Sequence, residues 1–239
     1  MAPKLKRRLL DFSTAPYRET GYINYRWARG KLGIDPIFPA LIQRAILPDN
    51  ARVLDLGCGR GLLASWLLSA ERLAERGEWR GNTTPPKGLH FRGVELMARE
   101  PVCGNEALQP LYGDRVQLSG GNMRHAELGE VDVVAILDVL HYIPYEEQDT
   151  LLDRIRAALG PNGLFVTRVG NADASLRFAF SQLVDRSISF IQGHRLAQMW
   201  CRPLWQWTST LEARGFAVEA IPMSTGTPFA NVMLIARAT

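Results

Sequence analysis

The alternation of short apolar runs with helix-periodic segments predicts a repeated strand–helix order. Apolar runs bounded by turn residues indicate strands, and they lie at residues 52–56, 90–97, 115–123, 131–137 and 164–170. Apolar residues recur at helical spacing between these runs, at residues 62–76, 98–112 and 146–159. This order predicts an α/β fold built on a largely parallel sheet.

Both ends of the chain depart from this alternation. Residues 1–20 are interpreted as a tail joined to a first helix, and residues 22–46 as two short helices broken near Gly33–Pro36. We therefore divide the chain into an N-terminal helical lid, 1–45, and a main domain, 46–239. A helical cap insertion is expected at about 172–202. A last helix and an antiparallel strand pair, "FAVEAIPM" and "NVMLIARA", complete the domain.

The stretch "RVLDLGCGRGLLA", Arg52 to Ala64, contains the clearest candidate binding motif. Gly57, Gly59 and Gly61 separate the first strand from its helix. Glycine permits positive φ and a close approach of the backbone to a ligand, and the following helix presents free N–H groups. A strand, glycine turn and helix in this order indicate a nucleotide-type site at the carboxyl end of the strand.

The charge next to this turn restricts the ligand. A dinucleotide site has the spacing G-x-G-x-x-G, whereas this turn has G-x-G-x-G with Asp55 two residues before the first glycine. A carboxylate so close would repel a pyrophosphate and would suit a ligand that carries an ammonium group. The alternative interpretation is an ordinary strand–helix turn without a ligand.

Composition narrows the class of protein. Apolar residues make up 46% of the chain, which is enough for a full core. The apolar runs are too short to span a bilayer, and we expect no secretory signal. The three cysteines, Cys58, Cys103 and Cys201, are odd in number and lack metal-ligand spacing. We therefore expect a cytoplasmic protein without disulfides or a metal site.

The positive charge is mild and concentrated at one end. The net charge is +4, and its clearest cluster is Lys4, Lys6, Arg7 and Arg8. Two interpretations stay open, a solvated tail or a weak contact with an anionic surface. Nucleic-acid binders usually concentrate their charge in a patch, so no nucleic acid is expected as partner. The oligomeric state stays open.

Three motifs, "LDLGCGRGLLASWL", "GVELM" and "ILDVLHYIP", resemble those of class I S-adenosylmethionine-dependent methyltransferases. The resemblance implies a Rossmann-like, doubly wound, seven-stranded sheet, mostly parallel with an antiparallel last strand. It also implies S-adenosylmethionine as cofactor and S-adenosylhomocysteine as product. "ARGKLGIDPIF", "LLDRIRAALGPNGLFVTRVGNAD" and "STGTPFANVMLIA" are similar to small methyltransferases of bacterial aryl polyene and xanthomonadin-type pigment pathways. This implies O-methylation of a small aromatic or polyene/polyketide-type acceptor in pigment or secondary metabolism.

The resemblance also implies residues that bind the cofactor. Glu95, at the end of the second strand, would accept hydrogen bonds from both ribose hydroxyls. Asn122 stands where many relatives have Asp, and its amide oxygen would accept from the adenine amino group, while Met123 packs on the adenine. The full implied set is Asp55, Gly57, Cys58, Gly59, Glu95, Leu96, Asn122, Met123, Leu137 and Asp138.

Candidate catalytic residues lie just after the fourth strand and at the end of the fifth. His141 would act as general base because its ordinary pKa is near neutrality; the alternative is a structural histidine at the start of a helix. Tyr142 would form a wall of the site or donate a hydrogen bond. Arg168 would hold an acidic acceptor or form a structural ion pair. His194 has no assigned role.

The acceptor is expected to meet Arg29 and Lys31, a cation pair suited to a carboxylate, and Phe178 of the cap. Two rival functions are a non-catalytic cofactor-binding subunit of a biosynthetic complex and a nucleic-acid methyltransferase. The second is disfavoured because "LDVLHY" stands where an Asn/Asp-Pro-Pro-aromatic motif would be expected.

Overall fold

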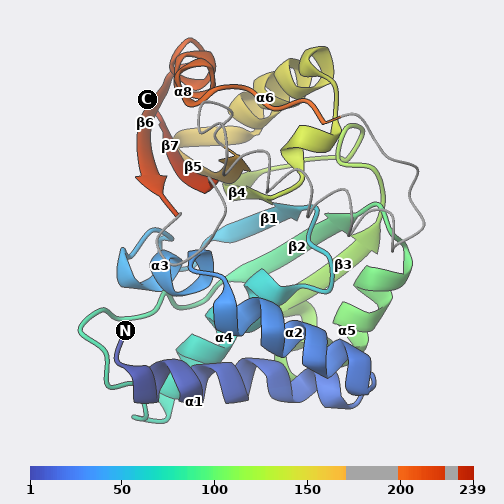
Figure 1. Ribbon diagram of the computed structural model, residues 1–239, viewed down its shortest axis with the longest axis vertical. Coiled ribbons are helices and arrows are strands. Elements are labelled where there is room, and N and C mark those ends of the chain that lie inside the picture. Colours follow the sequence, from blue (N-terminus) through green and yellow to red (C-terminus); the bar gives the residue numbers. More distant parts are fainter. Residues whose placement is uncertain (171–198, 224–230) are drawn as a thin grey trace. The chain divides into compact units, whose positions relative to one another are not determined.

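The computed structural model describes residues 1–170, 199–223 and 231–239. Its seven strands form one mixed sheet in the order β3-β2-β1-β4-β5-β7-β6 (Figure 1). β1 pairs with β2, and β2 with β3, in parallel, whereas β7 is antiparallel to both β5 and β6. The predicted sheet with an antiparallel last strand is confirmed. The strands are β1 (Arg52–Leu56), β2 (His90–Glu95), β3 (Val116–Gly120), β4 (Val131–Leu137), β5 (Leu159–Gly170), β6 (Phe216–Pro222) and β7 (Asn231–Ala238).

The chain divides into two units. The first contains residues 1–127 and 131–133, and the second contains 128–130 and 134–239. No helix among the described residues is long and apolar enough to cross a membrane.

In the first unit, the parallel strands differ in burial, since β3, at the edge of the sheet, buries only Val116 and Leu118, whereas β1 is covered on both faces. After Arg52, every residue of β1 is buried. Helix α4 (Leu62–Glu75) follows β1, and most of its residues are buried, including the fully covered Trp66 and Leu67. It is apolar over most of its circumference because it contacts four other helices, α1 (Pro3–Thr14), α2 (Tyr22–Ile34), α3 (Ile37–Gln43) and α5 (Arg99–Tyr112).

The predicted first helix is present, but it begins already at Pro3, so the prediction of a tail before it is wrong. Helix α1 packs on α4 and buries Leu5 and Leu9 one turn apart. Its basic side chains lie on the other faces of the helix, and Arg8 forms an ion pair with Glu78 at 2.7 Å. Only two deeply buried apolar residues stand among the four basic ones, so the amphipathic pattern is weak in the sequence.

The next two helices were predicted correctly. α1 is followed by a 3₁₀ turn, η1 (Ala15–Arg18), and by helix α2 (Tyr22–Ile34). The chain then breaks before α3, where the Asp35 Oδ1 atom accepts a hydrogen bond from the Ile37 N–H at 3.1 Å. α2 packs on α1, η1 and α4, and it buries Ala28 and Leu32.

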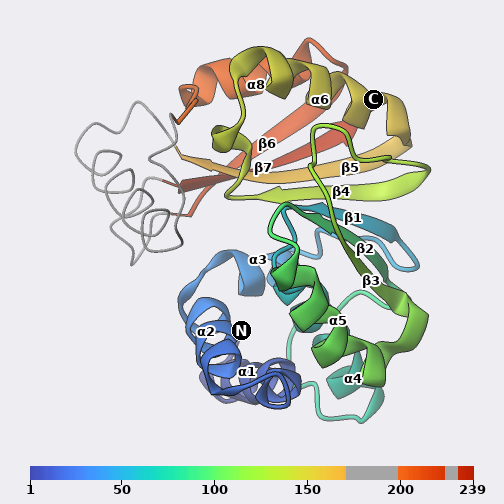
Figure 2. The ribbon, with the colours of Figure 1, turned by 90° about the vertical axis from the view of Figure 1, so that its right-hand side faces the viewer.

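In the second unit, two helices lie side by side, α6 (Tyr145–Ala158) and α8 (Leu204–Glu212) (Figure 2). Arg214, just after α8, forms ion pairs with Asp149 and Asp153 of α6. β5 begins at Leu159, earlier than predicted, so the segment 160–163 belongs to the strand and does not form a separate turn. The terminal strand pair was predicted correctly. Most of the predicted cap, with Phe178 and His194, lies outside the described residues.

Candidate functional site

The glycine turn between β1 and α4 has the backbone that the sequence predicts. Gly57, Gly59 and Gly61 have φ values of 81°, 53° and 74°. The Gly57 N–H donates to the Val94 carbonyl at 2.8 Å, which holds the turn against β2. A Cβ atom on Gly61 would lie 2.8 Å from Leu118 Cδ1, whereas one on Gly59 would meet nothing within 4 Å. The turn is therefore packed at Gly61 and open at Gly59.

Glu95 lies at this turn, as the resemblance implies. Its Oε2 atom accepts a hydrogen bond from the Gly59 N–H at 3.0 Å, and its Oε1 atom accepts one from the Met97 N–H at 3.0 Å. The parallel pairing of β1 with β2 brings the acid at the strand end to the glycines. Each carboxylate oxygen keeps a second lone pair, so Glu95 can also accept from two hydroxyl groups of a ligand.

Asp55 is a buried carboxyl on β1, with 4% of its surface exposed. Burial, and next the nearby charge of Glu95, raise its pKa to about 7. Its carboxylate accepts no hydrogen bond from the described part of the chain, so a cation is the group that would stabilise its charged form. Cys58 is buried beside Asp55, and burial raises the pKa of its thiol. It fills the space over Gly93, where a Cβ atom would lie 2.6 Å from the sulfur.

The residues after β3 lie at the same end of the strands as Glu95. The Gly121 N–H donates to the Glu95 carbonyl at 2.8 Å, which places Asn122 and Met123 next in the chain. The Asn122 Oδ1 atom accepts hydrogen bonds from N and Nε of Arg124, at 3.0 and 3.3 Å. Its predicted contact with an adenine amino group stays a prediction. Leu96 is 68% exposed.

The N-terminal helices hold the glycine turn through residues that sequence reasoning missed. The hydroxyl of the fully buried Tyr17 donates to the Arg60 carbonyl at 2.9 Å. The Arg60 guanidinium pairs with Glu100 at 2.6 Å and lies 4.9 Å from the centre of the Trp27 ring. Tyr17 was missed because its region was interpreted as a tail, and no local pattern marks Arg60 as a contact.

Arg29 and Lys31, the predicted cation pair, both have partners on the N-terminal segment. Arg29 forms an ion pair with Asp11 at 2.7 Å, and Lys31 forms one with Asp35 at 2.9 Å. These pairs give each cation a structural role. Their predicted contact with a ligand carboxylate stays a prediction.

In the second unit, Leu137 and Asp138 stand at the end of β4. Asp138 has a φ of 64°, which is uncommon for a residue other than glycine. The Arg168 guanidinium, 4% exposed, binds the Asp138 carboxylate through two hydrogen bonds. Of the two interpretations of Arg168, the ion pair is therefore present, and a contact with an acidic acceptor stays a prediction.

His141 follows in a short 3₁₀ turn, η3 (Leu140–Tyr142). Its ring centre lies 4.3 Å from that of Tyr142, which is 38% exposed. Its Nε2 atom is buried and has no hydrogen-bond partner among the described residues. Burial lowers the pKa of His141, and the charge of Asp138 opposes this in part. The imidazole is therefore neutral at pH 7 and can accept a proton.

This chain belongs to the methyltransferase domain family, whose model matches residues 22–221. Among curated proteins, it is similar to the carboxy-S-adenosyl-L-methionine synthase of Chromohalobacter salexigens, with 28% identity over 53% of this chain and 42% of the relative. The enzyme of the same name from Glaesserella parasuis is 27% identical over 54% of this chain and 56% of the relative. The chain thus spans about half the length of the curated relatives it matches.

Solved structures show the same fold. Magnesium protoporphyrin IX methyltransferase from Synechocystis PCC 6803, with bound SAH, has a TM-score of 0.60 and 17% identity, covering 90% of this chain and 87% of that one. The pyocyanin biosynthetic protein PhzM has a TM-score of 0.62 and 18% identity, covering 90% and 58%. At such identities the likeness concerns the fold alone.

Proposed function

We propose that this protein binds S-adenosylmethionine and transfers its methyl group to a small-molecule acceptor. The observation that carries the proposal is the Gly59 turn, with open space beside its backbone and the Glu95 carboxylate bonded to its N–H. Membership of the methyltransferase domain family supports the same conclusion.

The residues of the first unit fit this cofactor. Asp55 is a buried carboxyl that accepts no hydrogen bond from the described residues, and an ammonium group suits it. Glu95 has lone pairs left for two ribose hydroxyls. Gly59 leaves space for a close backbone approach. When bound, S-adenosylmethionine supplies a methyl group on a sulfonium, which is already activated, so the main task of these residues is orientation.

His141 is proposed as the general base that takes the proton of an acceptor hydroxyl. A buried neutral imidazole with a lowered pKa is in the form that accepts a proton. A well-placed base contributes about 10²–10⁴-fold. Tyr142, in ring contact with His141, would form the neighbouring wall.

The acceptor is proposed to be a small aromatic or polyene/polyketide-type molecule of bacterial pigment or secondary metabolism, methylated on oxygen. The sequence stretches shared with pigment-pathway methyltransferases support this assignment. The N-terminal helices are proposed to form a lid over the cofactor, because Tyr17 and Trp27 already contact Arg60 of the glycine turn.

A second candidate comes from the curated relatives, whose names describe synthesis of a carboxylated S-adenosylmethionine. In that case the cofactor itself would be the substrate, and no methylated acceptor would form. Mass spectrometry of the nucleoside product separates the two, because methyl transfer releases S-adenosylhomocysteine, whereas carboxylation yields a heavier sulfonium. A non-catalytic subunit would bind the cofactor and release neither product.

The test combines binding with product analysis. Calorimetry is expected to show micromolar-range binding of S-adenosylhomocysteine by the full chain. Incubation with methyl-labelled S-adenosylmethionine and a bacterial metabolite extract is expected to transfer the label to a small molecule. Tighter binding of NAD than of S-adenosylhomocysteine would overturn the proposal, and so would absence of labelled product together with a carboxylated nucleoside.

A further inference from the structure

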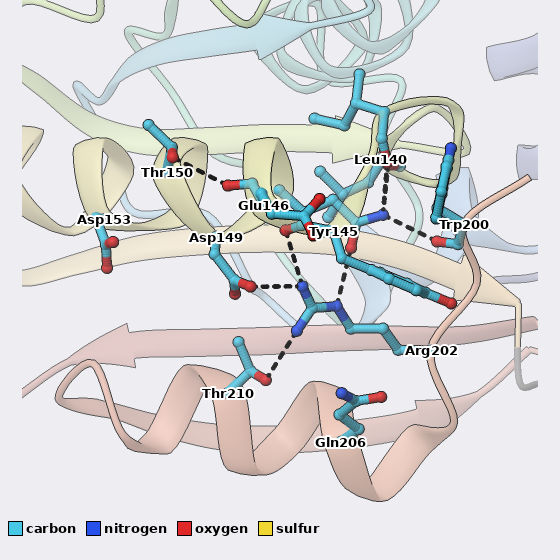
Figure 3. Close-up of polar contacts among 12 residues, drawn as sticks. Leu140, Tyr145, Glu146, Asp149, Thr150, Asp153, Trp200, Arg202, Gln206 and Thr210 are labelled. Atoms are coloured by element: carbon cyan, nitrogen blue, oxygen red, sulfur yellow. Dashed lines mark hydrogen bonds and ion pairs between the residues drawn. The ribbon is translucent and has the colours of Figure 1, made fainter.

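A buried amide on α6 holds the turn that carries His141. Gln148 is fully buried, and its Nε2 atom donates to the carbonyls of Leu140 at 3.2 Å, Ile143 at 3.0 Å and Trp200 at 2.8 Å (Figure 3). The first two carbonyls flank His141 in the chain. Leaving a buried carbonyl without a donor is unfavourable, so these bonds favour one conformation of the turn.

Arg202 determines which way the Gln148 amide points. Its Nε atom donates to Gln148 Oε1 at 3.0 Å, and a guanidinium has only donors. The oxygen of Gln148 must therefore face Arg202, and its NH₂ group must face the carbonyls. Arg202 is itself fixed, since it donates to the Tyr145 carbonyl at 3.0 Å and to Asp149 Oδ2 at 2.8 Å.

Aromatic rings complete the surroundings of Arg202. Its guanidinium carbon lies 5.1 Å from the centre of the Tyr145 ring and 5.4 Å from that of Trp207. Only 4% of the Arg202 surface is exposed, so this charge is buried and paired with Asp149. Such a network specifies one geometry when all its members are satisfied.

His141 depends on this network because its buried Nε2 atom has no hydrogen-bond partner among the described residues that would fix the ring. Its backbone carbonyl accepts from the Trp200 N–H at 2.8 Å, and Trp200 is also bonded to Gln148. A three-residue 3₁₀ turn has little hydrogen bonding of its own. The Leu140 carbonyl also accepts from the Ile143 N–H at 3.4 Å, and the other bonds to the carbonyls of Leu140, His141 and Ile143 come from Gln148 and Trp200.

We infer that Gln148 and Arg202 are positioning residues, which place the His141 imidazole for proton transfer in the proposed methyl transfer. The inference rests on that proposed function for its catalytic part. A misplacement of about 1 Å can cost about 10²-fold in rate, so loss of the network should lower turnover and leave cofactor affinity unchanged.

The direct test is spectroscopic and needs no turnover. The full chain is labelled in its histidine rings, and the His141 signal is assigned by its loss in His141→Ala. In Gln148→Met, which keeps the side-chain length and removes the amide, we expect a shift in the His141 resonance and in its pKa. The resonances of His90 and His125, in the other unit, should stay unchanged. Arg214→Lys is the matched control. Arg214 bonds to Asp149 and Asp153 of α6, whereas the Gln148 amide oxygen accepts its hydrogen bond from Arg202.

Kinetics test the catalytic part once an acceptor is known. Gln148→Met should lower kcat by about tenfold to 10²-fold with KM for S-adenosylmethionine within about twofold. The same substitution in a His141→Ala background should cost little more. Arg202→Lys keeps the positive charge and removes the planar set of guanidinium donors. It serves as the second variant if Gln148→Met does not fold.

Two outcomes would overturn the inference. One is an unchanged His141 resonance and pKa in a folded Gln148 or Arg202 variant. The other is that Gln148→Met lowers kcat by the same factor in the wild-type chain and in the His141→Ala background. If His141→Ala alone left turnover unchanged, the general base would be refuted, while the spectroscopic shift would still decide whether the network positions His141.

Discussion

Replacement of Asp55 by Asn should stabilise the protein at pH 8 while it weakens cofactor binding. The pKa of this buried carboxyl is about 7, against an ordinary value of 3.8, so the native state keeps its proton to a higher pH than the unfolded chain. The free energy of unfolding therefore falls as pH rises from 3.8 to about 7, and the loss persists above that. A shift of about three pH units corresponds to at most about 4 kcal/mol.

The assay is urea unfolding of the wild-type chain and Asp55→Asn at pH 5 and pH 8. The gain in free energy of unfolding from the substitution should be larger at pH 8, because only there is the wild-type carboxyl charged in the native state. Asp132→Asn is the control, because the pKa of Asp132 is shifted in the opposite direction to that of Asp55. Asp132 pairs with Arg52 at 3.1 Å and has a lowered pKa, so this substitution should not stabilise the chain at pH 8.

The cofactor measurement uses the same Asp55→Asn variant. The amide that replaces the carboxylate has no charge to offer an ammonium group, so calorimetry at pH 8 should show weaker binding of S-adenosylhomocysteine. A gain in stability with a loss of binding is the usual pattern at a functional site. An equal effect on unfolding at pH 5 and pH 8, or undiminished binding, would refute the assignment of Asp55 as a buried partner for the ligand.

Four further results are expected. Glu95→Ala should weaken S-adenosylhomocysteine binding by about 1–3 kcal/mol in calorimetry, as for lost bonds to a charged group; unchanged affinity would contradict its role. Gly61→Ala should lower the Tm of the free protein more than Gly59→Ala, because both have positive φ and only Gly61 lacks space. His141→Ala should lower turnover by about 10²-fold or more, with cofactor affinity within about threefold; collapse of binding would assign it to the cofactor site. Ligand binding should slow amide exchange in residues 17–45 if they form a lid, and unchanged exchange would leave them as ordinary packing.

The parts of the fold that depend on local pattern could be predicted from sequence. β4 contains a continuous apolar run from Val133 to Leu137, and the glycine turn is defined by spacing over five residues. The position of Glu95 follows from the end of the next strand, because parallel neighbours end at the same edge. Each of these features is determined by residues close together in the chain.

Contacts between distant segments could not be predicted in this way. Tyr17 and Arg60 are 43 residues apart, and Gln148 and Arg202 are 54 apart. Their sequence neighbourhoods resemble ordinary helix and turn positions, and only packing shows that one side chain reaches the other. The same holds for the partner of Arg168, where sequence left two interpretations and the fold brings Asp138 within reach.

The network around Gln148 has a consequence for protein engineering. Before residue 171, Gly170 is paired with Asn231 in the sheet, and after residue 198, Trp200 is bonded to both His141 and Gln148. A segment from a related protein could therefore be inserted in place of residues 171–198, between Gly170 and Trp200. The entropy of closing such a graft grows only slowly with its length, so exchanges of unequal length should be tolerated while both anchors are kept.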